Sequence, residues 1–233
     1  MSVESIREAE RKSHEEIYST AKLFEKGSWL QKPVKTILDI LPLFEEYEAL
    51  SVLDLGCGVG RNSIPIAQAF QNAKCIIDCV DILDMAIDKL NYYSDEYGVS
   101  DCINGIVTSI DDFEIEKNGY DIILSVSSLE HINSEDAFIN KLYEIRNGIK
   151  ENGVVCLIVN SEISETDKQS GKPLEPQFEV NLKTDKLVSL FQDVFIDWQF
   201  LKTTVVNQRY DIPRNDCVAD LTTNVVTCVV RKA

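Results

Sequence analysis

Basic residues and histidines are scarce in this sequence, and no stretch of 18 apolar residues occurs. The missing apolar stretch excludes a helix that spans a bilayer. Lysine and arginine number 23 against 39 acidic residues, which gives a net charge of −16, and they never run for more than two residues. Because so acidic a surface repels phosphate backbones and anionic lipid headgroups, we expect neither a nucleic-acid partner nor a membrane partner.

Metal sites and disulfides also lack their usual patterns. Only His14 and His131 are present, and none of the seven cysteines forms a C-x-x-C pair. Five of the cysteines lie in or beside apolar runs, where a free thiol behaves as a small hydrophobic residue. The N-terminal segment is charged throughout and does not have the pattern of a secretory signal. We therefore expect reduced cysteines, no metal and a cytoplasmic location.

The chain is long enough for one large α/β domain, with 233 residues of which 44% are hydrophobic. Residues 1–49 are predicted to form a helical extension. An amphipathic helix over Ser2–Lys26 places Ile17, Ala21 and Phe24 on one face, and Gly27 and Ser28 interrupt it. A second helical pattern follows, and its apolar positions are Val34, Ile37, Leu38 and Leu41.

From residue 50 onward, short continuous apolar runs alternate with helical patterns. The candidate strands are Ser51–Leu55, Cys75–Val80, Cys102–Val107, Asp121–Val126 and Val154–Val159. The candidate helices between them are Asn62–Gln71, Leu83–Tyr97 and Glu135–Ile149. Continuous apolar strands are buried on both faces, which predicts a parallel sheet covered by helices on each side.

The last third of the chain has a different pattern. Ser161–Gln177 is polar and contains two prolines, so we expect a long functional loop there. A helix is predicted over Thr184–Phe191. Two long strand patterns, Phe195–Val206 and Asp220–Val230, flank a turn expected at Asp211–Pro213. The simplest arrangement of this pair is an antiparallel hairpin at the sheet edge.

The strongest motif is VLDLGCGVGRNS, at positions 52–63 between the first strand and a helix. Gly56, Gly58 and Gly60 allow a sharp turn and close approach of a ligand to the backbone. Dinucleotide binding is the main competitor for such a loop, but its third glycine would fall at position 61, which is Arg61.

Two carboxylates distinguish the alternatives. Asp54 precedes the first glycine by two residues, where it would repel a pyrophosphate but would suit a cationic group such as an α-ammonium. Asp81 ends the second strand, 21 residues beyond Gly60, and can accept both hydroxyls of a ribose. A cationic adenosine ligand without phosphates is S-adenosylmethionine.

On these motifs the chain resembles the class I S-adenosylmethionine-dependent methyltransferases, from about residue 50 to 160. The resemblance includes TSIDDF after the third strand, YDIILSVSSLEHI over the fourth strand and its exit, and IRNGIKENGVVCLIV over the fifth. The triplet Arg61-Asn62-Ser63, with GSWL at 27–30, is similar to the tellurite-resistance-type branch.

This resemblance implies a Rossmann-like sheet of seven strands, in the order 3-2-1-4-5-7-6 with the last strand antiparallel. It also implies a cofactor site on residues 50–233. We expect residues 1–49 to act as a lid, because a charged amphipathic helix precedes the domain, Gly27 and Ser28 supply a hinge, and Trp29 follows directly. The cofactor-binding residues implied are Asp54, Gly56, Cys57, Gly58, Gly60, Asn62, Asp81, Ile82, Ser109, Ile110, Ser125 and Trp29. Ser109 stands where the family usually has an acidic residue, and Asp111 lies close by.

Four further residues have weaker signals. His131 is the one candidate for a general base, Trp29 could pack in the core or cover the sulfonium, and Arg209 with Tyr210 could hold an anionic substrate or lie at the surface. The function implied is methyl transfer to a small oxygen, sulfur, nitrogen or metalloid nucleophile. Neither a Pro-Pro-Tyr element nor a Pro-Cys nucleophile follows the fourth strand, which argues against nucleic-acid methylation. Two alternatives remain: a module that binds the cofactor without turnover, and an NAD-dependent oxidoreductase.

Overall fold

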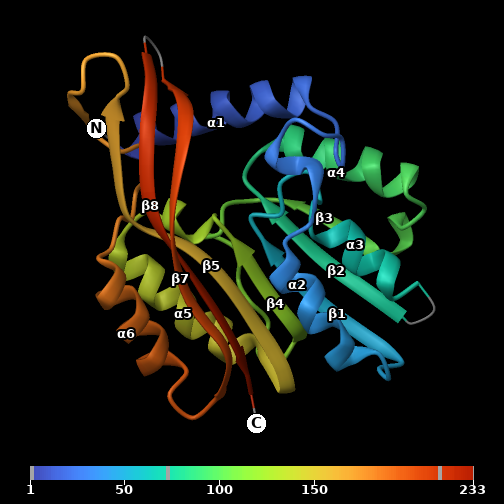
Figure 1. Ribbon diagram of the computed structural model, residues 1–233. Coiled ribbons are helices and arrows are strands. Elements are labelled where there is room, and N and C mark those ends of the chain that lie inside the picture. The colour runs from blue at the N-terminus through green and yellow to red at the C-terminus, as the bar shows by residue number, and fades with distance from the viewer. Residues whose placement is uncertain (1–2, 72–73, 215–216, 233) are drawn as a thin grey trace.

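A single mixed sheet organises the computed structural model, which describes residues 3–71, 74–214 and 217–232 (Figure 1). The sheet order is β3-β2-β1-β4-β5-β8-β7, and β6 pairs with β5 outside this path. The strands are β1 (Ala49–Leu55), β2 (Lys74–Asp81), β3 (Ile103–Val107), β4 (Tyr120–Val126), β5 (Ile149–Asp167), β6 (Pro173–Leu174), β7 (Gln199–Arg214) and β8 (Cys217–Arg231). The α-helices are α1 (Val3–Thr20), α2 (Lys35–Ile40), α3 (Ser63–Ala69), α4 (Asp84–Glu96), α5 (Glu135–Gly148) and α6 (Thr184–Val194). The 3₁₀ turns are η1 (Trp29–Gln31), η2 (Leu41–Phe44), η3 (Ser100–Cys102) and η4 (Leu129–His131).

The predicted sheet order is confirmed, and β6, a strand of two residues, is the one addition. Strands β1 to β5 pair in parallel, β8 runs antiparallel to β5, and β7 runs antiparallel to β8. The chain leaves β1 toward β2 on one side and returns later to β4 on the other. A ligand of an open α/β sheet binds at the carboxyl ends of the strands beside such a reversal. The topology therefore places a candidate site between the ends of β1, β2 and β4.

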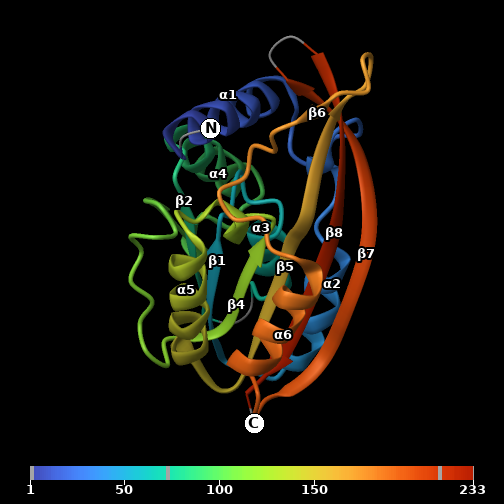
Figure 2. The same ribbon diagram turned by 90° about the vertical axis from the view of Figure 1, so that its left-hand side faces the viewer.

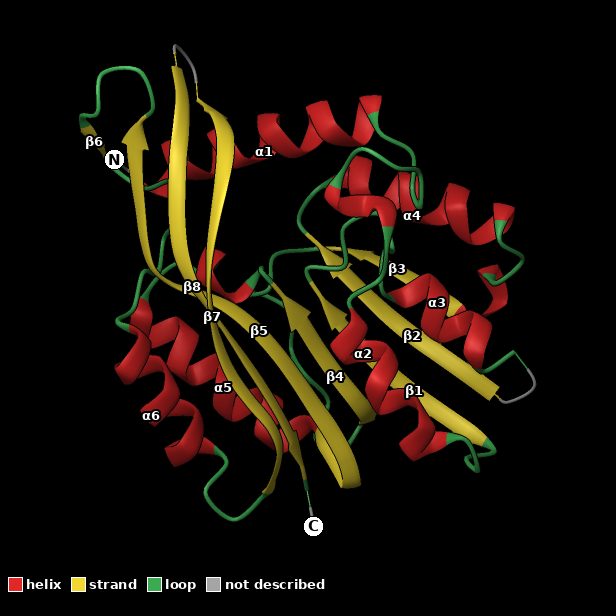
Figure 3. Ribbon diagram, in the orientation of Figure 1, coloured by secondary structure: helices red, strands yellow, loops and turns green. Residues whose placement is uncertain are grey.

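Two apolar clusters enclose the sheet, one on each face (Figure 3). On one face α2, α3 and α4 contribute side chains such as Ile37, Ile64 and Leu90. On the other face α5 and α6 contribute side chains such as Leu142 and Phe191. The first six residues of β4 are all buried, as the continuous apolar pattern predicts for a strand covered on both sides.

The long loop predicted over Ser161–Gln177 is wrong in its first half, because β5 continues to Asp167 and pairs with β8 to the end. Side chains alternate between buried and exposed from Ser161 to Glu165, which is the pattern of a strand covered on one face. Arg214 donates hydrogen bonds to both carboxylate oxygens of Glu165, at 2.6 and 2.8 Å. This ion pair offsets the cost of burying the charge of Glu165.

The hairpin turn predicted at Asp211–Pro213 is also wrong. Strand β7 runs through these residues to Arg214, and the connection to β8 falls at 215–216, outside the described residues. Pro213 is tolerated because an edge strand needs no backbone donor on its outer side. The hairpin therefore stands beyond the parallel strands, next to α1 (Figure 2).

The N-terminal helices are shorter than predicted. Helix α1 ends at Thr20, although Ile17, Ala21 and Phe24 all pack against the core as expected. The second helix breaks into α2 and η2 at Leu41, where Pro42 fixes the start of the 3₁₀ turn, and Leu38 is exposed instead of buried. All seven cysteines are free, and five of them are buried. No helix among the described residues is long and apolar enough to cross a membrane.

Candidate cofactor and acceptor site

The glycine loop follows β1 directly, and its backbone needs the glycines that the sequence supplies. Gly56, Gly58 and Gly60 have φ values of 76°, 53° and 89°, which a side chain disfavours. At Gly56 a Cβ atom would stand 2.2 Å from the Cβ of Ser128, so the end of β4 packs directly on the loop. The hydroxyl of Ser128 donates to the carbonyl of Leu55 at 2.6 Å and thereby ties the ends of β4 and β1 together.

Asp54 lies under this loop and is fully buried. Its Oδ2 accepts a hydrogen bond of 2.5 Å from Ser63, the first residue of α3. Burial raises the pKa of Asp54 to about 7, and the hydrogen bond from Ser63 opposes that rise. The carboxyl group is therefore poised to gain or lose a proton near neutral pH when a charge approaches it.

Asp81 organises the loop from the end of β2. Its Oδ2 accepts from the backbone N–H of Gly58 at 2.8 Å, and its Oδ1 accepts from that of Leu83 at 3.0 Å. Burial raises the pKa of Asp81, while these hydrogen bonds and the nearby charge of His14 oppose the rise. One carboxylate thus links the glycine loop to the start of α4.

Other predicted residues surround the loop in different ways. Ile82 is exposed, and Ile110 lies beside Gly56. Ser109 donates to Asp112 at 2.7 Å in the turn after β3. Ser125 is buried in a hydrogen bond of 2.6 Å with the hydroxyl of Ser128, so its contact is internal to the fold.

The N-terminal segment lies across the carboxyl ends of the strands. Asn62 accepts a hydrogen bond of 3.0 Å from the backbone N–H of Val34, and Cys57 is buried in the loop. The hydroxyl of Tyr18 stands 2.8 Å from the position of a Cβ on Gly58, so only a glycine leaves room for it. In Figures 1 and 2 helix α1 lies above the arrowheads of β1 and β4.

Trp29 joins this cover through Arg61. The guanidinium of Arg61 lies 5.1 Å from the centre of the Trp29 ring and donates to the Trp29 carbonyl at 2.9 Å. The Trp29 ring also makes edge contacts with the rings of His14 and Tyr18, each at 6.2 Å. In this structure the cation facing Trp29 is therefore Arg61.

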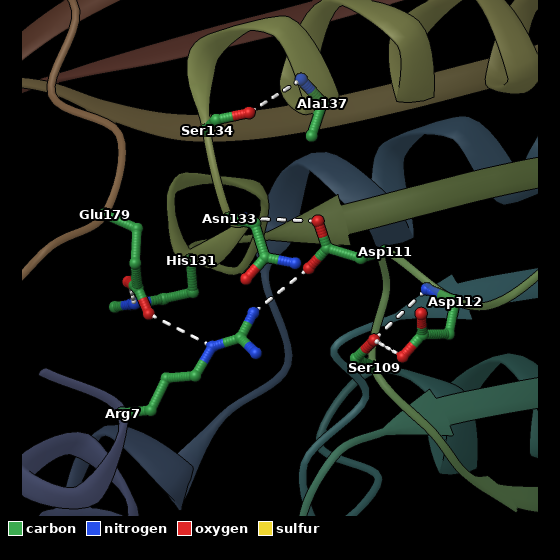
Figure 4. A network of polar contacts seen from close by, with 9 residues as sticks. All are labelled: Arg7, Ser109, Asp111, Asp112, His131, Asn133, Ser134, Ala137 and Glu179. Carbon is green, nitrogen blue, oxygen red and sulfur yellow. Dashed lines mark hydrogen bonds and ion pairs between the residues drawn. The ribbon is translucent and has the colours of Figure 1, made fainter. Parts of the chain in front are cut away.

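A second polar network, shown in Figure 4, fixes the other end of α1. Arg7 contacts Asp111 at 3.1 Å and Glu179 at 3.4 Å. The second oxygen of Glu179 lies 3.0 Å from Nδ1 of His131, whose ring stacks on Phe178 at 5.0 Å. The side chain of Glu179 is fully buried, so its charge is screened little by water.

Glu130, next to His131, is another buried carboxyl group at the exit of β4. Its Oε1 accepts from the side chain of Asn160 at 2.5 Å, and its Oε2 has no hydrogen-bond partner among the described residues. Burial raises the pKa of Glu130, and the charge of His131 opposes the rise. Sequence reasoning missed Arg7, Tyr18, Glu130 and Glu179 as site residues.

Arg209 and Tyr210 point to opposite faces of the sheet, because they occupy successive positions on β7. Arg209 binds both oxygens of Asp220 on β8, so its charge is already matched within the hairpin. Burial raises the pKa of Tyr210, and the charge of Arg61 opposes that rise. Tyr210 therefore lies on the side of the glycine loop, whereas Arg209 does not.

Two negative observations complete the geometry. No group of three His, Cys, Asp or Glu side chains among the described residues has an arrangement that could hold a metal ion. A hollow of about 660 Å³ lies at the start of α6, but none of the predicted site residues lines it. The predicted site residues gather instead at the glycine loop, where the carboxyl groups of Asp54 and Asp81 suit a cationic ligand that carries hydroxyl groups.

Comparison with known proteins supports this interpretation of the loop. A methyltransferase domain model matches residues 52–153. The ubiquinone biosynthesis O-methyltransferase of Rickettsia conorii is 30% identical over 135 residues, which cover 55% of this chain and 42% of that protein. Malonyl-[acyl-carrier protein] O-methyltransferase 1 of Ilyobacter polytropus is 27% identical over 125 residues, which cover 54% of this chain and 44% of that protein. The chain thus spans less than half the length of these two relatives.

Among solved structures, TehB from Haemophilus influenzae has the same fold. The two structures align with a TM-score of 0.63 at 18% identity, over 86% of this chain and 62% of that one. At this identity the similarity concerns the fold alone.

Proposed function

We propose that this chain is a class I S-adenosylmethionine-dependent methyltransferase, which transfers a methyl group from S-adenosylmethionine to a small-molecule acceptor and releases S-adenosylhomocysteine. The methyltransferase domain model over residues 52–153 and the similarity to O-methyltransferases support the proposal. The observation that carries the proposal is the glycine loop between Asp54 and Asp81, at the point where the sheet reverses its strand order. The acceptor supplies an oxygen, sulfur, nitrogen or metalloid nucleophile.

Each proposed site residue binds a different part of the cofactor. Asp81 faces the ribose hydroxyls, Asp54 balances the α-ammonium, and Ile82 and Ile110 flank the adenine, whose amino group lies toward Ser109. The donor set fits the ligand, because no phosphate has to approach the two carboxylates. S-adenosylmethionine supplies a methyl group that is already electrophilic, so the protein contributes alignment and exclusion of water.

Residues 1–49 act as the lid in this proposal. Arg7 and Tyr18 are 11 positions apart in α1, which at 1.5 Å per residue is about 16 Å. The helix therefore reaches from the network around Glu179 to the glycine loop. A lid with two such anchors excludes water from the reacting atoms and completes the acceptor pocket.

His131 is the side chain that we assign to take a proton from an acceptor that must lose one. Glu179 holds its Nδ1 and fixes the ring, as a carboxylate orients the imidazole in other acid–base pairs. An acceptor that is already ionised needs no such step. The role of His131 therefore depends on the acidity of the acceptor.

The test combines binding and turnover on the full chain. Calorimetry measures the dissociation constants of S-adenosylhomocysteine and of NADH. Transfer of a labelled methyl group is then followed with phenols, thiols, amines, carboxylic acids, selenite and tellurite. Binding of S-adenosylhomocysteine with methylation of one class supports the proposal. Binding without any methylation favours a non-catalytic module, and preference for NADH favours an oxidoreductase.

The lid is tested separately by Trp29 fluorescence. Trp198 is replaced by phenylalanine so that Trp29 gives the signal alone, and S-adenosylhomocysteine is added. A change in emission is expected, because the contact between Trp29 and Arg61 lies at the mouth of the glycine loop. Unchanged emission at a saturating concentration of S-adenosylhomocysteine would assign Trp29 to packing.

Seven free thiols support the cytoplasm as the proposed compartment.

A further inference from the structure

Strand β7 ends the sheet and leaves its outer edge open. It pairs with β8 on one side along Gln199–Arg214, and the sheet order ends there. Every second backbone N–H and C=O of this strand points outward, where water or another strand must satisfy it. Most of its side chains are exposed, including Val205 at 47% and Val206 at 50%. A strand of 16 residues with these properties is a template for pairing.

A bulge, a proline or an unpaired charged side chain usually prevents an edge strand from pairing with another strand, and the middle of β7 has none of these. The bulge lies at one end, between Phe200 and Lys202, and Pro213 lies near the other. The ammonium of Lys202 is turned toward Thr36 of α2, at 2.7 Å. From Thr203 to Tyr210 the one charged side chain is Arg209, which Asp220 neutralises.

The charge of this edge also differs from that of the rest of the chain. With 39 acidic residues among 233, a segment of twelve would hold about two, yet residues 199–210 hold none. Two copies of a protein with a net charge of −16 repel each other over most surfaces. They repel least where acidic residues are absent, and this favours the β7 edge as the place where copies meet.

We propose that two copies of this chain associate through antiparallel pairing of β7 with β7, around a two-fold axis at Val205. The axis places Val205 opposite its own counterpart, Thr204 opposite Val206, and Lys202 opposite Gln208. No two like charges are opposed in this register, and the two valine positions and the threonine methyl groups cover each other. The bulge at Phe200 ends the ladder. The partner is a second copy because a two-fold axis lets one strand serve as both halves of the interface.

Sedimentation of the full chain between about 1 and 200 µM tests the association, since edge contacts of this size give weak dimers. A concentration-dependent dimer is expected. Val205→Lys places two like charges opposite each other and is expected to raise the dissociation constant at least tenfold. Ser189→Lys on α6 makes the same charge change away from the edge and is the matched control. A chain that stays monomeric, or a dimer that Val205→Lys does not weaken, would overturn the proposal.

Cross-linking tests the register. In Val205→Cys the two introduced cysteines face each other across neighbouring strands, with Cα atoms about 5 Å apart, which a disulfide spans. In Thr203→Cys the same two positions are offset by four residues, about 14 Å along the strand, and cannot be joined. We expect mild oxidation to give a covalent dimer with Val205→Cys and none with Thr203→Cys or the unaltered chain. The reverse result, or no cross-link with either variant, would refute the two-fold axis at Val205.

Discussion

Replacing Asp54 with asparagine is expected to stabilise the fold and weaken cofactor binding at the same time. Burial raises the pKa of Asp54 from 3.8 to about 7, so the folded state disfavours the carboxylate. Between these two values the folded protein holds a proton that the unfolded chain has lost, and stability therefore falls as the pH rises from about 4 to 7. The cost at higher pH reaches about 4 kcal/mol, from roughly three pKa units at 1.36 kcal/mol each. Asp54→Asn removes this cost above pH 7 and changes little below pH 4.

Binding is expected to have the opposite dependence, because in the proposed site the α-ammonium of S-adenosylhomocysteine attracts the ionised form of Asp54. With a pKa of about 7, one molecule in eleven is ionised at pH 6 and ten in eleven at pH 8. The affinity is therefore expected to rise about tenfold between these values, with a proton released on binding at the lower pH. In Asp54→Asn the rise disappears, and the affinity at pH 8 is lower by about 10- to 150-fold, as for a lost hydrogen bond to a charged group.

Calorimetry at pH 6, 7 and 8, in buffers with different heats of ionisation, measures both the affinity and the proton release. Urea unfolding at the same pH values measures the stability. Asp54→Asn is also the control that assigns the pH dependence to Asp54. If the variant binds S-adenosylhomocysteine as tightly as the unaltered chain at pH 8, Asp54 does not contact the ammonium and the assignment is refuted.

Three further predictions concern the rest of the site. Asp81→Ala should weaken S-adenosylhomocysteine binding by about 10- to 150-fold, from the loss of hydrogen bonds to a charged acceptor; an unchanged dissociation constant by calorimetry would remove Asp81 from the site. Deletion of residues 1–29 should leave the sheet folded by circular dichroism and reduce methyl transfer far more than cofactor affinity; equal turnover would make the segment packing only. Arg7→Gln and Glu179→Gln should each slow methyl transfer, and the double variant should be no slower than Glu179→Gln, because both changes break one buried contact; additive effects in kcat would contradict a shared network.

The parallel half of the fold follows from the sequence because each strand carries its own signal. A run such as Ile122–Leu124 is apolar without interruption, and only a strand covered on both faces needs that pattern. The extension of β5 carries no such signal, since Ser161 and Glu165 are polar and yet buried. Glu165 is buried because Arg214 reaches it from 49 positions away, and no local pattern announces that contact.

The candidate site likewise combines a local motif, which the sequence predicts, with contacts between distant residues, which it does not. The glycine loop was predictable because three glycines and a carboxylate within seven residues determine one local geometry. Arg7 and Glu179 meet only after the whole sheet has formed, across 172 positions, and each looks like a solvated charge in the sequence. The contact of Tyr18 with the glycine loop also forms only in the folded chain. Its approach to Gly58 needs both the turn after α1 and a glycine with a positive φ.

If α1 covers the cofactor as proposed, entry and exit of the cofactor depend on the same movement of this helix. In the proposed lid, spent cofactor leaves the glycine loop after the contacts of Arg61 with Trp29 and of Arg7 with its two carboxylates have broken. The rate of exchange is then set by how often α1 lifts, which depends on what is attached to its outer end. A bulky fusion at the N-terminus would slow or speed turnover without touching a reacting atom, whereas the same fusion at the C-terminus lies at the opposite end of the sheet and would leave turnover unchanged (Figure 1).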